Sequence, residues 1–209
     1  MHKALHGYLQ RKQFHDGQRY DRHAGRVSRG MHQRVAEDVA DAAPTGGLVL
    51  DAGCGTGRLA VQIAQRRPDL RVHGVDLEPG MLDAALHRAE HEHLTDRVRF
   101  TAADLADLPL PDQSVDLIVS TISMHHWVDV PAVVASLGRV TRPHGRIWIY
   151  DIRWVPGRGV RTAAADLGRP VNRTLVRTGR LPIAFFQRLS VDPATPSPDS
   201  AGAAAGSDG

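Results

Sequence analysis

The chain has 209 residues, of which 42% are hydrophobic and 23% charged, with one cysteine and a formal net charge of +3. This length suits one domain with a single sizeable core, and the composition is that of an ordinary globular protein. No apolar run reaches about 18 residues, which argues against a membrane-spanning helix. A single cysteine excludes an internal disulfide, and the start of the chain lacks the apolar core of a signal peptide. We therefore expect a cytoplasmic protein.

The charge is distributed unevenly along the chain. Residues 1–34 carry a net charge of +6, residues 35–141 carry −8 and residues 142–190 carry +8. Basic flanks around an acidic centre are compatible with an anionic acceptor or with nucleic acid. They are equally compatible with a solvated, arginine-rich surface, since only two of the 26 basic residues are lysine. The distribution alone leaves the partner open.

The first 43 residues are predicted to form a polar, helical lid. Val35 and Val39 lie four residues apart, as on one face of a helix, and Pro44 and Gly46 end that helix. Aliphatic strands and helices then alternate. The expected strands are 48–53, 71–77, 97–104, 115–123 and 145–153, and the expected helices are 58–67, 81–94 and 130–142. This order predicts an α/β fold, Rossmann-like and doubly wound, with a mostly parallel sheet and helices on both faces.

The pattern weakens after residue 153. One short helix is expected over 161–168, and two closing strands over 174–180 and 184–191 bring the sheet to seven strands. Residues 192–209 are rich in Pro, Ala, Gly, Ser and Asp without an apolar period, which predicts a disordered tail. The expected organisation is therefore a lid (1–43), an α/β domain (44–191) and a tail (192–209).

A glycine-rich loop follows the first strand. The stretch VLDAGCGTG places Gly53, Gly55 and Gly57 between that strand and the next helix. Ligands of open α/β sheets bind beyond the carboxyl ends of the strands, and glycine lets a ligand lie against the backbone. A dinucleotide site would require G-x-G-x-x-G, whereas this loop has the spacing D-x-G-x-G-x-G. A nicotinamide oxidoreductase is therefore only a minor alternative.

Four motifs, in order, resemble those of the class I S-adenosylmethionine-dependent methyltransferases, in particular the quinone-biosynthesis and natural-product types. The first is VLDAGCGTG, and the second is GVDLEPGML. The third is AADLADLPLPDQSVDLIVS, and the fourth is RPHGRIWIYD, which ends at Asp151. The resemblance covers about half of the chain, and it implies S-adenosylmethionine as the cofactor of the domain over 44–191.

The resemblance also implies which residues hold the cofactor. The glycine loop would wrap its methionine part, Asp76 would accept hydrogen bonds from both ribose hydroxyls, and Asp104 with the backbone of Leu105 would contact the adenine. A carboxylate suits a vicinal diol because it accepts two hydrogen bonds. Leu77 and Met81 are expected to sandwich the adenine. The implied cofactor set is Asp51, Gly53, Gly55, Gly57, Asp76, Leu77, Met81, Asp104, Leu105, Ser120 and Tyr20.

Tyr20 enters that set through the segment 14–30, which resembles a lid. There Tyr20 would close over the cofactor, and Arg26 or Arg29 would meet its carboxylate. A solvated amphipathic helix is the alternative reading of the same segment.

Methyl transfer places few demands on the protein. The sulfonium methyl is already activated, so the protein mainly positions and desolvates the reactants. A base is needed only if the acceptor must lose a proton. His125 and His126, which follow the fourth strand, are the candidate catalytic residues. The alternative is that they only shape the pocket, and Trp127 is expected to be a pocket wall or core residue.

The predicted function is S-adenosylmethionine-dependent methyl transfer to a small organic acceptor, with O-, N- or C-methylation left open. One alternative is RNA methylation, which the basic flanks favour but the motif STISMHHW does not, since it lacks the Asn/Asp-Pro-Pro-Tyr/Phe arrangement of amino-methylating enzymes. Another is a cofactor-binding or partner protein without catalysis. We expect no metal site and no membrane partner.

Overall fold

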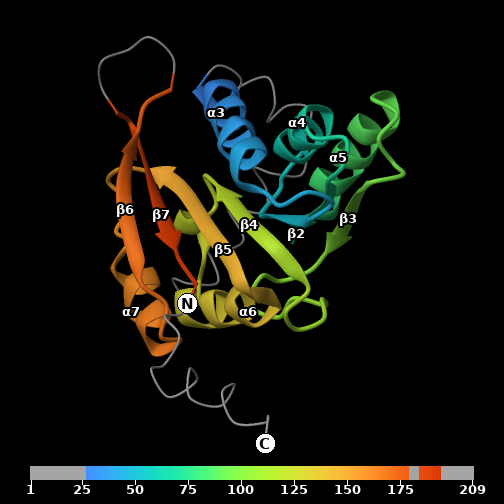
Figure 1. The fold of residues 1–209 in the computed structure, drawn as a ribbon. Coiled ribbons are helices and arrows are strands. Elements are labelled where there is room, and N and C mark those ends of the chain that lie inside the picture. The colour runs from blue at the N-terminus through green and yellow to red at the C-terminus, as the bar shows by residue number, and fades with distance from the viewer. Residues whose placement is uncertain (1–26, 179–183, 194–209) are drawn as a thin grey trace, which may run out of the picture.

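Seven strands form a single sheet in the computed structural model, which describes residues 27–178 and 184–193. The strand order is β3-β2-β1-β4-β5-β7-β6 (Figure 1). The five strands β1 to β5 are parallel, and β7 is antiparallel to both of its neighbours. The strands are β1 Leu48–Ala52, β2 Arg71–Asp76, β3 Val98–Ala102, β4 Val115–Thr121, β5 Thr141–Ile152, β6 Val171–Val176 and β7 Phe186–Val191. The predicted fold class is confirmed.

Helices cover both faces of this sheet (Figure 1). The core has two parts, one between the sheet and the first helices and one between the sheet and the last. The central strand β4 is buried along almost its whole length, as a parallel strand covered on both faces must be. One face carries α3 Val27–Ala42, α4 Arg58–Arg66 and α5 Pro79–His91, and the other carries α6 Val130–Val140 and α7 Arg158–Asp166.

Two of the last elements, α7 and β6, begin earlier than the sequence predicts, whereas β7 begins two residues later, at Phe186. The strand expected over 174–180 is β6, and it starts at Val171 and ends at Val176. Pairing decides these limits, because β6 matches the six residues of β7 from Val171 opposite Val191 to Val176 opposite Phe186. As an edge strand, β6 has four exposed positions in succession, so its sequence shows no apolar alternation. The helix α7 likewise starts at Arg158 instead of residue 161.

The two terminal predictions lie mostly outside the described residues. Of the expected lid (1–43), the structure describes α3 and the turn after it, and Val35 and Val39 are fully buried against the sheet, as their spacing predicts. Of the expected tail (192–209), only residues 192 and 193 are described. Among the described residues, no helix combines the length and the apolar character needed to cross a membrane.

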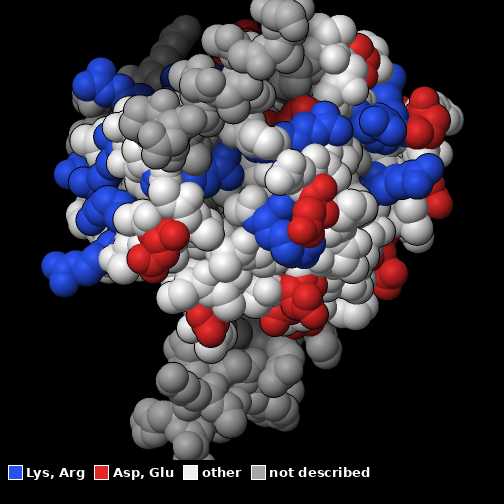
Figure 2. All heavy atoms as spheres, turned by 60° about the horizontal axis from the view of Figure 1, so that its bottom comes forward, with Lys and Arg blue, Asp and Glu red and all other residues white. Residues whose placement is uncertain are grey.

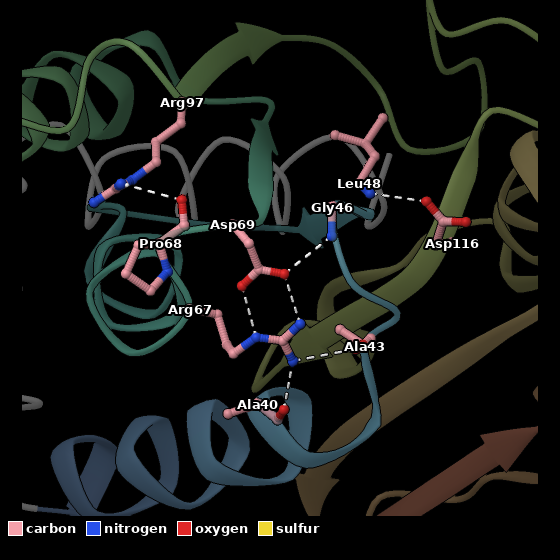
Figure 3. Close-up of polar contacts among 9 residues, drawn as sticks. All are labelled: Ala40, Ala43, Gly46, Leu48, Arg67, Pro68, Asp69, Arg97 and Asp116. Carbon is pink, nitrogen blue, oxygen red and sulfur yellow. Dashed lines mark hydrogen bonds and ion pairs between the residues drawn. The ribbon is translucent and has the colours of Figure 1, made fainter.

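A polar network closes the edge at which β1 and β2 begin (Figure 3). The Arg67 guanidinium at the end of α4 donates Nε and Nη2 to the two carboxylate oxygens of Asp69, each at 2.8 Å. It also donates Nη1 to the carbonyls of Ala40 and Ala43, at the end of α3. Asp69 in turn accepts the Gly46 N–H at 3.0 Å. One ion pair therefore satisfies a helix end and joins three segments, which fixes α3 and α4 against the start of the sheet.

Basic side chains gather on one side of the molecule. In Figure 2 they follow the left edge, where Figure 1 places β6, β7 and α7, whereas both signs of charge mix elsewhere on this face. Exposed members are Arg158 and Arg161 of α7 and Arg173 of β6. The excess of positive charge over residues 142–190 is thus concentrated beside the closing strand pair.

Candidate functional site

The glycine loop lies at the carboxyl edge of β1, as predicted, but its glycines serve different purposes. A Cβ at Gly53 would collide with the Ser123 side chain, and one at Gly57 would lie 2.7 Å from Phe100 Cζ. Both positions are therefore closed by the protein's own atoms. Gly55 has φ +52° and no heavy atom within 4 Å of a built Cβ. Open space beside its half-buried backbone makes Gly55 the position where a ligand can lie against the chain.

Asp76, at the end of β2, holds this loop in place. Its Oδ2 accepts the Gly55 N–H at 2.8 Å, and its Oδ1 accepts the Glu78 N–H at 3.1 Å. The loop is also tied to β2 by the N–H groups of Gly53 and Cys54, which both donate to the Val75 carbonyl. Each carboxylate oxygen of Asp76 keeps further acceptor capacity. Asp76, the residue predicted to bind the ribose, therefore lies next to the loop and can accept two more hydrogen bonds.

Two buried polar side chains lack a partner at the same edge. Asp51 in β1 and Ser120 in β4 are fully buried, and among the described residues neither Asp51 oxygen nor the Ser120 hydroxyl has a hydrogen-bond partner. Burial and, to a smaller extent, the nearby Asp76 carboxylate together raise the pKa of Asp51 to about 7. Unpartnered buried polar groups are costly, so they point to a ligand that completes them.

The predicted adenine contacts differ in exposure. The Leu77 side chain is 62% exposed, whereas Met81 is 3% exposed in the interior. Asp104 is exposed, and its Oδ1 accepts the Ala106 N–H at 2.9 Å, which caps the turn after β3. Leu105 is buried in the core on the α6 side. Leu77 and Asp104 thus offer free surface, and the adenine assignments stay predictions.

The two candidate bases occupy the short helix η1 Met124–His126, directly after β4. Ile122, which precedes it, has φ +52°, a conformation that is strained for a β-branched residue. The strained turn is held by the hydrogen bond from Ile122 N–H to the Tyr150 carbonyl. Strain that the surrounding structure enforces is typical of loops that aim a functional side chain, and here that loop carries His125.

His125 is held by a carboxylate that the sequence reasoning did not assign. Its Nδ1 lies 3.0 Å from Oδ1 and 3.1 Å from Oδ2 of Asp151, the penultimate residue of β5. The His125 backbone N–H donates to the same carboxylate, as does that of Ile152. The Asp151 side chain is 0% exposed and the His125 side chain 29% exposed. With Asp151 accepting from Nδ1, the proton is assigned to Nδ1, and Nε2 is left as an acceptor.

His126 and Trp127 have supporting positions. The His126 ring lies against the His125 ring, with centroids 4.0 Å apart and planes inclined by 47°. Trp127 donates its Nε1–H to Ser123 Oγ at 3.2 Å and packs against the core on the α6 side. Trp127 is therefore partly a core residue, which is one of the two roles expected from the sequence. Ser123 contacts both this ring and the glycine loop, which ties η1 to the loop.

The remaining sequence predictions concern Cys54, the residues of the expected lid and a metal site. Burial raises the pKa of the Cys54 thiol, so this loop cysteine fills space and has no nucleophilic character. Tyr20 and Arg26 lie outside the described residues, and Arg29 is an exposed residue of α3. Within residues 27–178 and 184–193, no three His, Cys, Asp or Glu side chains are arranged to hold a metal ion.

Comparison with known proteins places these features in a family. Residues 49–145 match the family model described as "Methyltransferase domain". The chain is 34% identical over 145 residues to the 27-O-demethylrifamycin SV methyltransferase of Amycolatopsis mediterranei, covering 68% of this chain and 53% of that one. It is 32% identical over 125 residues to the demethylmenaquinone methyltransferase of Deinococcus radiodurans, covering 60% and 50%. The chain thus spans about half the length of the curated relatives it matches.

Solved structures show the same fold at low sequence identity. A putative S-adenosylmethionine-dependent methyltransferase from Methanococcus maripaludis superposes with a TM-score of 0.74 at 18% identity, over 88% of this chain and 95% of that one. The [4+2]-cyclase SpnF superposes with a TM-score of 0.68 at 17% identity, over 78% and 82%. A methyltransferase and a cyclase on one fold show that the chemistry depends on the site and not on the architecture.

Proposed function

We propose that this chain, which belongs to the class I S-adenosylmethionine-dependent methyltransferases, transfers the methyl group of that cofactor to a small organic acceptor. The observation that carries the proposal is the open space at Gly55, with the Asp76 carboxylate on one side and the unpartnered Asp51 below the loop. When bound, S-adenosylmethionine would supply an activated methyl group, and S-adenosylhomocysteine would be the leaving group that the acceptor displaces in line from the methyl carbon.

The residues of this edge fit the parts of the cofactor. Asp76 already accepts one backbone N–H on each oxygen, and its remaining lone pairs suit the two ribose hydroxyls. Asp51 and the Ser120 hydroxyl suit the ammonium end of a methionine group, because a cation nearby would supply the missing partner of a buried carboxylate. The exposed side chain of Leu77 supplies an apolar surface for the adenine.

His125 is the residue we assign to proton removal. The hydrogen bond from Nδ1 to Asp151 fixes the ring, and Nε2 keeps its lone pair for the acceptor. Bound S-adenosylmethionine would supply the methyl group and leave as S-adenosylhomocysteine when its sulfur–methyl bond breaks, and His125 Nε2 would accept the proton that the acceptor loses. Asp151 stabilises the resulting imidazolium. The His126 ring lies against the His125 ring, with centroids 4.0 Å apart, so we assign it a pocket-shaping role.

The experiment is titration calorimetry of S-adenosylhomocysteine against the wild type, Asp76→Ala and the control Asp83→Asn. Asp83 is exposed on α5, so the control removes a carboxylate of the same kind away from the loop. We expect micromolar binding by the wild type and the control, and at least tenfold weaker binding by Asp76→Ala. A folded wild type that does not bind the cofactor product would refute the proposal and favour a partner protein without catalysis.

RNA is the alternative acceptor, and the arginines beside β6 and α7 favour it (Figure 2). Phosphate contacts make RNA binding strongly dependent on salt. Retention of the chain on structured RNA that falls steeply between about 50 and 200 mM salt, together with methylation of that RNA, would support this alternative. Turnover of small acceptors without RNA retention would reject it.

A further inference from the structure

An exposed aromatic pair lies just beyond the carboxyl end of β5, the strand that carries the carboxylate bound to the candidate base. Trp154 is 66% exposed and Phe185 is 41% exposed, and their ring centroids are 6.3 Å apart in an edge-to-face arrangement. Trp154 follows Asp151 by three residues, so its Cα lies within about 11 Å of the Asp151 Cα. Phe185 is held there because its carbonyl accepts the Arg153 N–H at 2.9 Å. Two large apolar rings are therefore turned to solvent at the edge of the sheet where the methyl group would be transferred.

A cation is built into this pair. The Arg153 guanidinium lies 5.2 Å from the centroid of the Trp154 ring, and its Nη1 donates to the Ala184 carbonyl. A second guanidinium, that of Arg173, donates Nη2 to the Arg153 carbonyl and Nε to Gln187 Oε1. Among the described residues, no carboxylate forms an ion pair within 4.0 Å with either guanidinium. The cluster therefore combines apolar ring surface with positive charge that the protein does not neutralise.

The carboxylate of Asp151 does not reach this surface. Asp151 is 0% exposed, and its oxygens are occupied by the His125 ring and by two backbone N–H groups. The rings and the cations thus face solvent without competition from a carboxylate of the described chain. Fixed aromatic rings with one adjacent cation match a molecule that has a flat apolar body and one anionic group.

We propose that Arg153, Trp154 and Phe185 form the acceptor-recognition subsite, and that the acceptor is a planar aromatic molecule carrying a carboxylate or phenolate. Its ring system packs on Trp154 and Phe185, and its anionic group pairs with Arg153. This inference rests on the proposed function, because the subsite is defined by its position beyond the carboxyl end of β5, the strand next to β4, which His125 follows. In the strand order β1-β4-β5-β7, the glycine loop follows β1, His125 follows β4 and the subsite lies at β5 and β7. An acceptor bound at the subsite would therefore have His125 between it and the glycine loop.

The test uses two probes with the same ring system, 2-naphthoate and its neutral amide 2-naphthamide. Each is titrated into the full chain saturated with S-adenosylhomocysteine, after binding of that product has been measured separately. We expect 2-naphthoate to bind more tightly than the amide. Arg153→Gln should weaken 2-naphthoate by about tenfold, the scale of one charge-assisted hydrogen bond, and change the amide by less than about twofold. Trp154→Ala should weaken both probes.

Matched controls and a shielding measurement complete the test. Arg71→Gln removes an exposed arginine at the start of β2, and Leu86→Ala removes an exposed apolar side chain of α5; neither should affect the probes. Iodide should quench the Trp154 fluorescence, measured as the difference between the wild type and Trp154→Phe. Equal binding of the two probes, no discrimination by Arg153→Gln, or a Trp154 shielded from iodide would each overturn the subsite. Loss of S-adenosylhomocysteine binding in the wild type would instead refute the proposed function.

Discussion

The Nδ1 atom of His125 lies 3.0 Å from Oδ1 of Asp151, a carboxylate that comes from a different strand and is completely buried. His125 follows β4 and Asp151 lies near the end of β5, so the pairing of these two strands fixes the orientation of the imidazole. Asp151 accepts two backbone N–H groups as well, which keeps its oxygens fixed. An imidazole held in this way has one tautomer and one free nitrogen, which is what a general base requires.

The first prediction concerns this pair. His125→Gln should lower kcat by about 10²- to 10⁴-fold, the usual contribution of general base catalysis, while S-adenosylhomocysteine affinity stays within about threefold. Asp151→Asn should lower kcat as well, because the amide no longer favours the proton on Nδ1. The measurement is kcat and KM across pH 5.5 to 9 for the wild type and both variants.

A structural role for Asp151 would give a different result. In that case Asp151→Asn would lower the melting temperature, and the folded enzyme would keep the kcat and the pH profile of the wild type. His126→Gln is the matched control for the base, since His126 lies one residue away and stacks on the same ring. A larger loss of kcat in His126→Gln than in His125→Gln would reverse the assignment.

The second prediction concerns the pH dependence of stability at Asp51. Burial raises the pKa of this carboxyl from 3.8 to about 7. Between these two values the folded chain keeps a proton that the unfolded chain has lost, so raising the pH through this window weakens the fold. The loss reaches up to about 4 kcal/mol near pH 7, and it does not grow further at higher pH.

Asp51→Asn should remove that slope. Urea denaturation at pH 5, 6, 7 and 8 gives the free energy of unfolding for the wild type, Asp51→Asn and the exposed control Asp83→Asn. We expect the variant to gain stability relative to the wild type as the pH rises and the control to follow the wild type. Parallel curves for Asp51→Asn and the wild type would show that Asp51 ionises normally in the folded chain.

The third prediction separates two glycines of the loop. Gly57→Ala would place a Cβ 2.7 Å from Phe100 Cζ and 2.8 Å from Ala85 Cβ at a positive φ, so it should destabilise the fold by about 2–4 kcal/mol. Gly55→Ala meets no atom and should cost only about 1–2 kcal/mol for its left-handed backbone. Its main effect should be at least tenfold weaker cofactor binding.

Denaturation and calorimetry on both variants check this difference. Gly46→Ala is the control, since Gly46 also has a positive φ and open space around it but lies at the opposite edge of the sheet. Gly46→Ala should match Gly55→Ala in stability and the wild type in cofactor affinity. Unchanged affinity in Gly55→Ala would mean that the cofactor does not pass over this residue.

The fourth prediction concerns the ion pair of Figure 3. The Arg67 guanidinium holds the pKa of Asp69 well below its usual range. Arg67→Ala should lower the melting temperature by about 2–8 °C, because the carbonyls at the end of α3 and the Asp69 carboxylate lose their common donor. Cofactor affinity should be unchanged, since the network lies away from the glycine loop.

The control for this prediction is Arg66→Ala, the neighbouring arginine, whose nearest carboxylate atom lies 3.7 Å away on the exposed Glu37. It should melt within about 1 °C of the wild type. The contribution of the Asp69 ion pair is fully present above the unfolded pKa of the carboxyl and is lost as the pH falls through its lower folded pKa, so the difference between the two variants should begin to shrink below about pH 4. A difference that does not shrink at all between about pH 5 and pH 2 would assign the effect to the two carbonyl contacts alone.

The sequence was sufficient for the sheet and the loop because both depend on local patterns. Buried aliphatic runs separated by amphipathic helices predict a parallel sheet wherever they occur, and the spacing of the three glycines depends on backbone geometry within one turn. The predicted boundaries of β6 were wrong because an edge strand with exposed arginine and threonine has no apolar alternation. Only its pairing with β7 determines where it begins.

The site was predicted less completely, for a related reason. His125 is recognisable by residue type and position, but its partner lies 26 residues further along the chain, and only the register of β4 against β5 brings them together. The strained turn at Ile122 is equally invisible, since no sequence rule expects a β-branched residue at a positive φ. The one available signal in the sequence was that Asp151 is an acid at the end of a predicted strand. Such an acid could have been considered as a partner for the candidate base.

The buried position of Cys54 has a practical consequence for labelling. It is the only thiol in the chain, it is 8% exposed, and burial raises its pKa, so thiol reagents have no reactive native target. A single cysteine introduced at an exposed position such as Arg71 would therefore carry a fluorophore or a spin label without prior removal of Cys54. The glycine loop would stay intact, because the label would lie at the start of β2 and not at the loop.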